Sequence, residues 1–230
     1  MYIVRVKGLL NYEYIYLIPV ILSAVISTRS FRWNSQIRFK LFSALLLLTV
    51  FIETFAISWK WFLHETILWN YDQSNLWIYN AFLTLRHLFT LSFIYFIIKF
   101  PLFKKIIVWS IVPFILFSIT NFLFIQTPFN VNSFTIILSN VILISTSSMY
   151  FKQTLEETKI IKLNSKSEVW ICLGVFVYYS GTLPFFMLFN KLITSSSPLL
   201  NSFLFINDTL NIVMYSLYLI GFLCLPQTQK

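Results

Sequence analysis

Three charged side chains fall inside long apolar stretches of the sequence. They are Glu53, Arg86 and Asp208. A charged group in the hydrocarbon of a bilayer is expensive, so such residues usually pair with one another or serve a function. Either Glu53 and Arg86 form a buried ion pair, with or without Asp208, that fixes helix packing, or all three line a cavity that binds a small polar ligand or an ion.

Amides and one histidine extend this set within the same apolar stretches. His87 directly follows Arg86, and asparagines interrupt three of the other stretches. The predicted polar cluster, for ligand binding or for packing, comprises Glu53, Arg86, His87, Asn121, Asn140, Asp208 and Asn211.

A hinge is predicted near residue 184. Pro184 lies inside an apolar segment and follows Ser180 and Gly181. Proline removes a backbone hydrogen bond and kinks a helix unless neighbouring groups satisfy the freed carbonyl. Ser180, Gly181 and Pro184 therefore mark either a mobile hinge or a static kink.

Several kinds of chemistry are not supported. The chain has only two histidines, His64 and His87, and no HExxH pattern, so a zinc hydrolase site with three histidines is excluded. Neither a Walker A motif nor GxGxxG is present, which argues against nucleotide binding. We predict no catalytic residue, no metal site and no cofactor, although a lipid hydrolase using Glu53 or Asp208 remains an alternative.

Composition indicates a membrane protein. Hydrophobic residues make up 58% of the 230 residues and charged residues only 11%. A soluble fold with so few charges would expose too much apolar surface. The net charge of +9 comes from Lys and Arg between the apolar segments, where they act as topology signals, so no nucleic-acid binding is predicted.

Stretches of about 20 apolar residues predict membrane-spanning helices. The sequence therefore predicts an all-α fold, a single domain over 1–230 built as a polytopic bundle of seven transmembrane helices. The predicted spans are 12–28, 40–62, 76–98, 104–125, 132–151, 168–190 and 201–224.

Basic residues in the connections predict the orientation of the bundle. One side of the membrane receives 12 Lys and Arg residues and the other side 4. Cytoplasmic loops carry the excess of positive charge, so the amino terminus is predicted outside and the carboxyl terminus inside. At about 1.5 Å per residue, Glu53, Arg86 and Asp208 then lie roughly 10–15 Å below the outer surface.

The 152–168 connection is rich in both signs of charge and is predicted to face the cytoplasm. Glu156 and Lys159 are spaced so that the preceding helix extends into this connection. The connection is interpreted either as a solvated loop near anionic lipid or as a docking surface for a signalling partner.

Three short patterns carry a resemblance to a group of proteins. They are Asn-Leu-Trp-Ile-Tyr-Asn at 75–80, the segment 170–181 and Asn-Asp-Thr-Leu-Asn at 207–211. With these patterns the chain resembles small seven-span membrane proteins common in Bacteroidota. Such bundles are similar to sensory membrane modules that accompany signalling kinases. The resemblance implies a sensor or accessory role that acts through a separate partner.

The leading functional hypothesis is a non-enzymatic sensor or accessory protein of a bacterial inner membrane. It binds a small ligand from the outer side and signals through a cytoplasmic or membrane partner, with the lipid bilayer as its environment. The alternatives are a transporter of small molecules or ions and a membrane-embedded enzyme that modifies lipid.

Overall fold

The computed structural model describes residues 14–32, 36–62, 75–156, 166–194 and 199–225, and these residues form helices and no strand. The π-helical turn η1 continues α5. The elements in chain order are α1 (Leu17–Ser27), α2 (Arg29–Arg32), α3 (Ile37–Phe62), α4 (Leu76–Ile97), α5 (Pro101–Thr120), η1 (Asn121–Ile125), α6 (Ser133–Glu156), α7 (Ser167–Thr194) and α8 (Leu199–Leu223).

Six of these helices are long and apolar enough to cross a membrane. They correspond to the last six predicted spans, and their ends lie within five residues of the predicted ends. The first predicted span, 12–28, corresponds to α1, which has only 11 residues. A helix of this length is about 16 Å long, roughly half the thickness of the hydrocarbon core. Residues 12 and 13 lie outside the described part of the chain.

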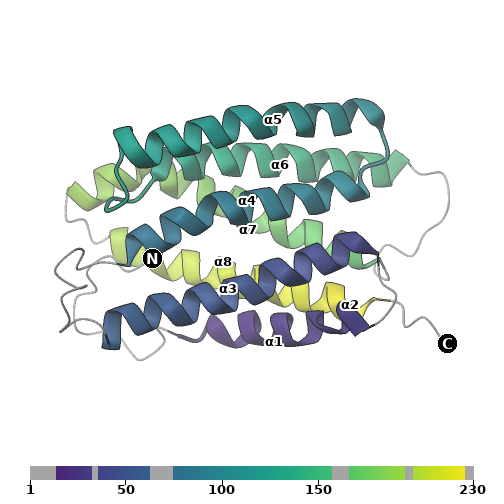
Figure 1. Ribbon diagram of the computed structural model, residues 1–230, viewed down its shortest axis with the longest axis horizontal. Coiled ribbons are helices and arrows are strands. Elements are labelled where there is room, and N and C mark those ends of the chain that lie inside the picture. The colour runs from purple at the N-terminus through teal and green to yellow at the C-terminus, as the bar shows by residue number, and fades with distance from the viewer. Residues whose placement is uncertain (1–13, 33–35, 63–74, 157–165, 195–198, 226–230) are drawn as a thin grey trace.

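Six of the described helices close a ring, and α5 lies outside it. Around the ring, α1 packs on α3, α3 on α4, α4 on α6, α6 on α7, α7 on α8 and α8 on α1. α5 packs against α4 and α6 and forms the edge of the bundle (Figure 1). Helices that are far apart in the sequence therefore contribute residues to the interior of the ring.

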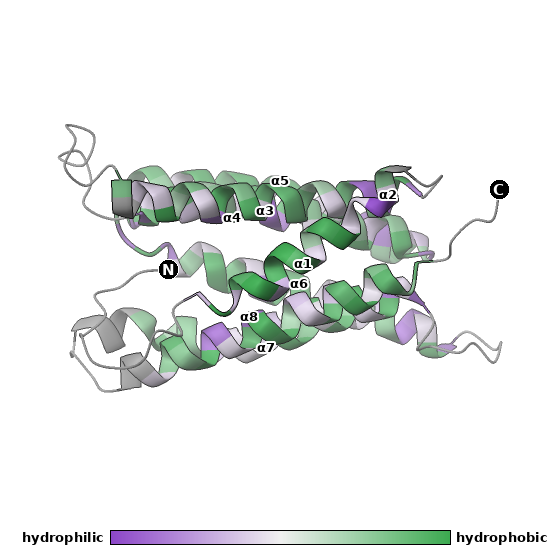
Figure 2. Ribbon diagram, turned by 90° about the horizontal axis from the view of Figure 1, so that it is seen from below, coloured by the Kyte–Doolittle hydropathy of each residue, from purple (hydrophilic) through white to green (hydrophobic). Residues whose placement is uncertain are grey.

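Apolar side chains cover the outside of the bundle, as lipid contact requires. On α5, Trp109 is 72% exposed, and Val112 and Leu116 are 62% exposed. Figure 2 shows that hydrophobic residues predominate along the helices and that strongly hydrophilic ones gather near the ends. Such a surface is suited to a bilayer and not to water.

Positive side chains gather at one end of the bundle, which we call the basic end. It is the end at which α3, α5 and α7 begin and α4, α6 and α8 finish. The described basic residues there are Arg29, Arg38, Lys40, Lys99, Lys104, Lys105, Lys152 and Lys166. The opposite end is called the pocket end, because the cavity described below lies in that half.

Aromatic side chains pack between the helices in the basic half of the bundle. The ring of Phe42 lies 4.9 Å from those of both Phe93 and Tyr218, and 6.3 Å from that of Phe222. Phe42 and Phe93 have no exposed surface. These residues join α3, α4 and α8 in one packed layer.

Two helices, α7 and α8, approach closely because glycines lie between them. A Cβ atom at Gly174 would lie 2.8 Å from Cε1 of Tyr218, and one at Gly181 would lie 2.8 Å from Cδ1 of Leu210. Small residues of this kind let transmembrane helices pack backbone to backbone. Gly181, which the sequence suggested as part of a hinge, thus has a packing role as well.

Gly221 provides a test of this close packing. A Cβ there would lie 2.9 Å from Cγ1 of Ile171 and 3.0 Å from the carbonyl oxygen of Ser167, which belongs to the backbone and cannot rotate away. We expect Gly221→Ala to lower the free energy of unfolding by about 1 kcal/mol through overpacking. Unfolding by heat or SDS in detergent measures this effect. Ala81→Val, which enlarges an exposed residue of α4, is the control, and equal stability of both variants would contradict the prediction.

Candidate functional site

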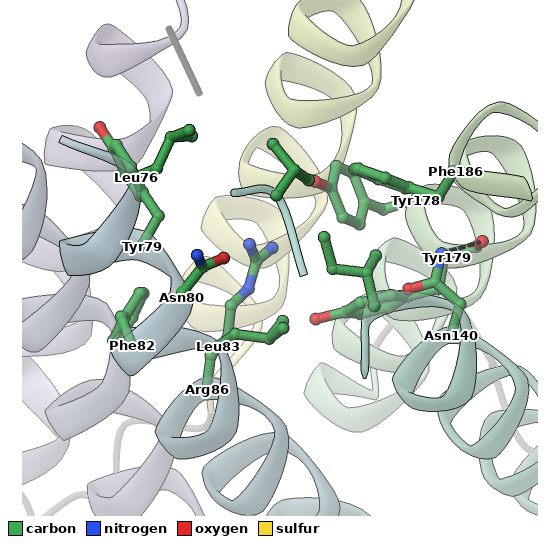
Figure 3. Close-up of a pocket in the computed structure, with 12 residues that line it drawn as sticks. Leu76, Tyr79, Asn80, Phe82, Leu83, Arg86, Asn140, Tyr178, Tyr179 and Phe186 are labelled. Atoms are coloured by element: carbon green, nitrogen blue, oxygen red, sulfur yellow. Dashed lines mark hydrogen bonds between the residues drawn. The ribbon is translucent and has the colours of Figure 1, made fainter. Parts of the chain in front are cut away.

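A cavity of about 120 Å³ lies in the pocket half of the ring, between α4, α6 and α7. Figure 3 shows the side chains that line it. The lining is mostly apolar, with Leu76, Leu83 and Phe186 among its members. Its polar members are Tyr79, Asn80, Arg86, Asn140, Tyr178 and Tyr179. An apolar cavity with a few polar groups is the usual form of a small-molecule site.

The guanidinium of Arg86 is the charged group of the cavity. It lies between Asn80 and the ring of Tyr178 (Figure 3). Its carbon lies 5.1 Å from the ring centre of Tyr178 and 5.7 Å from that of Tyr179. One nitrogen donates to Sδ of Met214 at 3.5 Å. The faces of aromatic rings attract a cation, and this attraction offsets part of the cost of burying it.

Arg86 forms no ion pair with any carboxylate of the described residues. Its electrostatic surroundings are four tyrosines, which include Tyr215 and Tyr218 of α8 in addition to Tyr178 and Tyr179. Phenol groups are neutral near pH 7. The predicted Glu53–Arg86 pair is therefore not formed, and the positive charge in the cavity is left without a counter-ion from this part of the chain.

Glu53 is held by hydroxyl groups instead. Its Oε2 accepts hydrogen bonds from Tyr16 at 2.9 Å and from Tyr79 at 2.8 Å. Tyr79 also lines the cavity, so Glu53 is one hydrogen bond away from it. Tyr215 interacts electrostatically with both Glu53 and Arg86. The two charged residues thus belong to one polar network, and tyrosines lie between them.

Asn80 fastens the connection that precedes α6. Its Nδ2 donates to the carbonyl oxygens of Pro128 at 2.8 Å and Asn130 at 2.7 Å, and its Oδ1 accepts from the backbone N–H of Asn132 at 3.3 Å. Val131 of this connection lines the cavity. Asn80 therefore holds a non-helical segment against the pocket end of the cavity.

Asn140 joins α6 to α7 beside the proline. Its Nδ2 donates to the carbonyl oxygen of Tyr179 at 3.3 Å and to the hydroxyl of Thr182 at 3.1 Å. α7 continues as a helix through Pro184. Whether Ser180, Gly181 and Pro184 form a working hinge stays a prediction.

His87 and Asn121 lie away from the cavity. Nδ1 of His87 is 2.8 Å from the hydroxyl of Ser139, and its ring stacks on Phe114 with centres 3.7 Å apart. Asn121 donates to the hydroxyl of Thr135 at 2.8 Å. Both residues are buried between α5 and its neighbours, where they fasten α5 to the ring.

The polar residues of α8 lie beside the cavity and are not among its described lining. The hydroxyl of Tyr178 donates to Oδ1 of Asn207 at 3.4 Å, and Asn211 donates to the carbonyl oxygen of Asn207 at 3.0 Å. Asp208 is half-buried. These contacts place Asn207 next to a residue that lines the cavity.

The structure thus brings two of the predicted residues, Arg86 and Asn140, into one cavity and connects Glu53 to it through Tyr79. Sequence reasoning missed Asn80, Tyr178 and Tyr179. A tyrosine or asparagine within an apolar segment is a weaker signal than a charge, because both residues are common in buried packing. In the described residues, no group of three His, Cys, Asp or Glu side chains is close enough to hold a metal ion.

Comparison of the chain with protein-family models, with curated proteins and with solved structures finds no match.

Proposed function

We propose that this chain is a non-enzymatic sensor or accessory module of a bacterial inner membrane, and that a small ligand binds in the cavity between α4, α6 and α7. The observation that carries the proposal is the guanidinium of Arg86, which lines this cavity without a carboxylate partner among the described residues. An ionisable group inside a membrane is by default a functional group, and its partner here is the ligand.

The orientation follows from the charge of the basic end. Lys and Arg concentrate on the cytoplasmic side of membrane proteins, so the basic end faces the cytoplasm and the pocket end faces outwards. The amino terminus then lies outside and the carboxyl terminus inside. In this proposal, α1 completes the ring as the first of seven crossings.

A signal leaves the cavity through α7. This helix supplies Tyr178 and Tyr179 to the cavity, and its first turn at the basic end carries Glu168. Oε1 of Glu168 lies 2.5 Å from Nη2 of Arg38 on α3. A ligand that shifts α7 therefore also changes a contact at the cytoplasmic surface. The 152–168 segment, of which residues 157–165 lie outside the described part of the chain, is the proposed docking surface for a separate signalling partner.

The aromatic packing of the basic half favours a sensor over a transporter. A transport path would need to continue from the cavity to the cytoplasm. Among the described residues, the rings around Phe42 pack between α3, α4 and α8 on that side. Liposome flux tests the transporter alternative directly, and solute uptake through the purified protein would contradict the sensor proposal.

Native mass spectrometry of the protein extracted gently from its own membrane tests the proposed site. We expect the wild type to carry a small-molecule adduct and a stoichiometric signalling protein. Leu83→Phe fills the cavity, so it is expected to lose the adduct. Leu85→Phe is the matched control, because Leu85 is 47% exposed on the outside of the same helix. An adduct retained by Leu83→Phe, or a bare wild-type chain, would contradict ligand binding in this cavity.

A further inference from the structure

Arg86 has hydrogen-bonding capacity that the described protein does not use. A guanidinium has five N–H donors in a fixed planar fork. One hydrogen bond goes to Sδ of Met214, the guanidinium also interacts with the hydroxyl of Tyr179, and no carboxylate or amide oxygen of the described residues accepts from it. Thioether sulfur is a weak acceptor. The cavity therefore presents a charged donor group that a ligand can engage.

Four of the other polar side chains of the cavity are already engaged. The amide of Asn80 holds the connection before α6, and that of Asn140 donates to α7. The hydroxyls of Tyr79 and Tyr178 donate to Glu53 and Asn207. The guanidinium of Arg86 is therefore the main group available to bind a ligand. The class of ligand then depends on which chemical groups a single guanidinium binds best.

A guanidinium prefers a planar anion with two oxygens. Arg binds a carboxylate through two parallel hydrogen bonds, which give both energy and orientation. A phosphate monoester carries about −1.5 to −2 charges at pH 7, more than one guanidinium offsets, and its third oxygen would need donors that the cavity has already committed. A carboxylate carries one negative charge and matches Arg86 alone.

The other residues that line the cavity favour a ligand with an apolar body. Leu76, Phe82, Leu83, Val131, Ile136 and Phe186 form most of its wall. Its volume of about 120 Å³ is close to that of an apolar cavity of about 150 Å³ that holds benzene. The space therefore accommodates one aromatic ring or a short chain beside the charged group.

We propose that the cavity binds an organic carboxylate, with the carboxylate on the guanidinium of Arg86 and the apolar body against α4, α6 and α7. This inference rests on the proposed function of the cavity as a ligand site. The same chemistry has two sources, a small acid that enters from the aqueous side and a fatty acid from the bilayer.

Thermal unfolding and calorimetry of the intact protein in lipid nanodiscs test the proposal with three probes. Benzoate is a small carboxylate, benzamide is its neutral counterpart of the same shape, and laurate is a fatty acid. We expect benzoate to raise the unfolding temperature and benzamide not to raise it. Stabilisation by laurate alone would also support carboxylate recognition and would identify the bilayer as the source.

Variants of Arg86 locate the binding. Arg86→Gln is expected to weaken benzoate binding by at least about tenfold, because a charge-assisted pair of hydrogen bonds is lost. Arg86→Lys keeps the charge and loses the fork, so an intermediate loss is expected. Lys105→Gln, which removes an exposed positive charge on α5, is the control for net charge.

Two results would overturn the inference. If benzamide stabilises the protein as well as benzoate does, the site does not select an anion. If none of the three probes binds, the ligand is not an organic carboxylate. Neither result removes the proposed function, which fails only if the mass-spectrometric adduct is missing or survives Leu83→Phe. If Arg86→Gln does not fold, Arg86→Lys and the contrast between benzoate and benzamide on the wild type still decide.

Discussion

Replacement of Gln153 by leucine is expected to lower the free energy of unfolding by about 2–3 kcal/mol, since buried backbone groups that lose their partner each cost about 1–3 kcal/mol. Gln153 is on α6 and is only 3% exposed. Its Oε1 accepts from the backbone N–H groups of Lys99 at 2.5 Å and Phe100 at 3.4 Å, and its Nε2 donates to the carbonyl oxygen of Ile97 at 3.4 Å. One side chain thus satisfies three groups where α4 ends and α5 begins.

Leucine has a similar volume to glutamine, so Gln153→Leu removes these hydrogen bonds without leaving a large cavity. Unfolding by heat or SDS in detergent measures the loss. Leu155→Ala is the matched control, because Leu155 lies on the same turn of α6 and is 77% exposed. If Gln153→Leu is as stable as this control, water or lipid headgroups satisfy the turn and Gln153 has no structural role.

The fold was predictable to the extent that it depends on apolar length. A run of about 20 apolar residues has few structural outcomes, because a bilayer requires every backbone group to be bonded within the helix. Six predicted spans are therefore present as helices. The first was predicted too long, because apolar length does not show where a helix begins. Residues 14–16 form a turn before α1, although they continue the same apolar and aromatic stretch.

The site was predictable only in part, because the sequence does not show which helices are neighbours. Charge inside an apolar segment identified Arg86 and Glu53 as costly residues. Their partners depend on the order of helices around the ring, and tyrosines from α4, α7 and α8 occupy the places where an ion pair was expected. Adjacent residues on a helix also point in different directions, so His87 faces α5 and α6 whereas Arg86 faces the cavity.

The proposed ligand site would explain why a charge without a carboxylate partner among the described residues is buried in the bundle. A guanidinium paired within the protein would gain little from a ligand, because the ligand would have to displace that partner. Here aromatic faces hold the charge in place without neutralising it. In the proposed site, an anionic ligand would supply the negative charge, so that binding and the removal of an electrostatic penalty would occur together. The differential affinity needed to shift a conformational equilibrium arises in this way.

Disruption of the contact between Arg38 and Glu168 is the second large expected effect. The two side chains are 23% and 18% exposed and join α3 to α7 at the basic end. Loss of one partner from a fully buried ion pair costs about 3–5 kcal/mol, and partial exposure reduces this value. We therefore expect Glu168→Gln to lower the free energy of unfolding by about 2 kcal/mol. Lys152→Gln, which breaks the exposed pair with Glu156, is the matched control and is expected to have almost no effect.

A charge exchange separates this specific contact from a general effect of charge. Arg38→Glu and Glu168→Arg each place like charges together, and the double variant restores an opposite pair, so the double variant should be more stable than either single variant. Additive losses in this cycle would show that the two residues do not interact.

The same variants connect the basic end to the cavity. If α7 transmits the signal, release of the contact by Glu168→Gln must change the affinity of the cavity for its ligand, because coupling between two sites is reciprocal. The affinity for benzoate, measured by calorimetry in Glu168→Gln and in Lys152→Gln, provides this test. An unchanged affinity in Glu168→Gln would leave the cavity as a binding site and would remove α7 as its route to the cytoplasm.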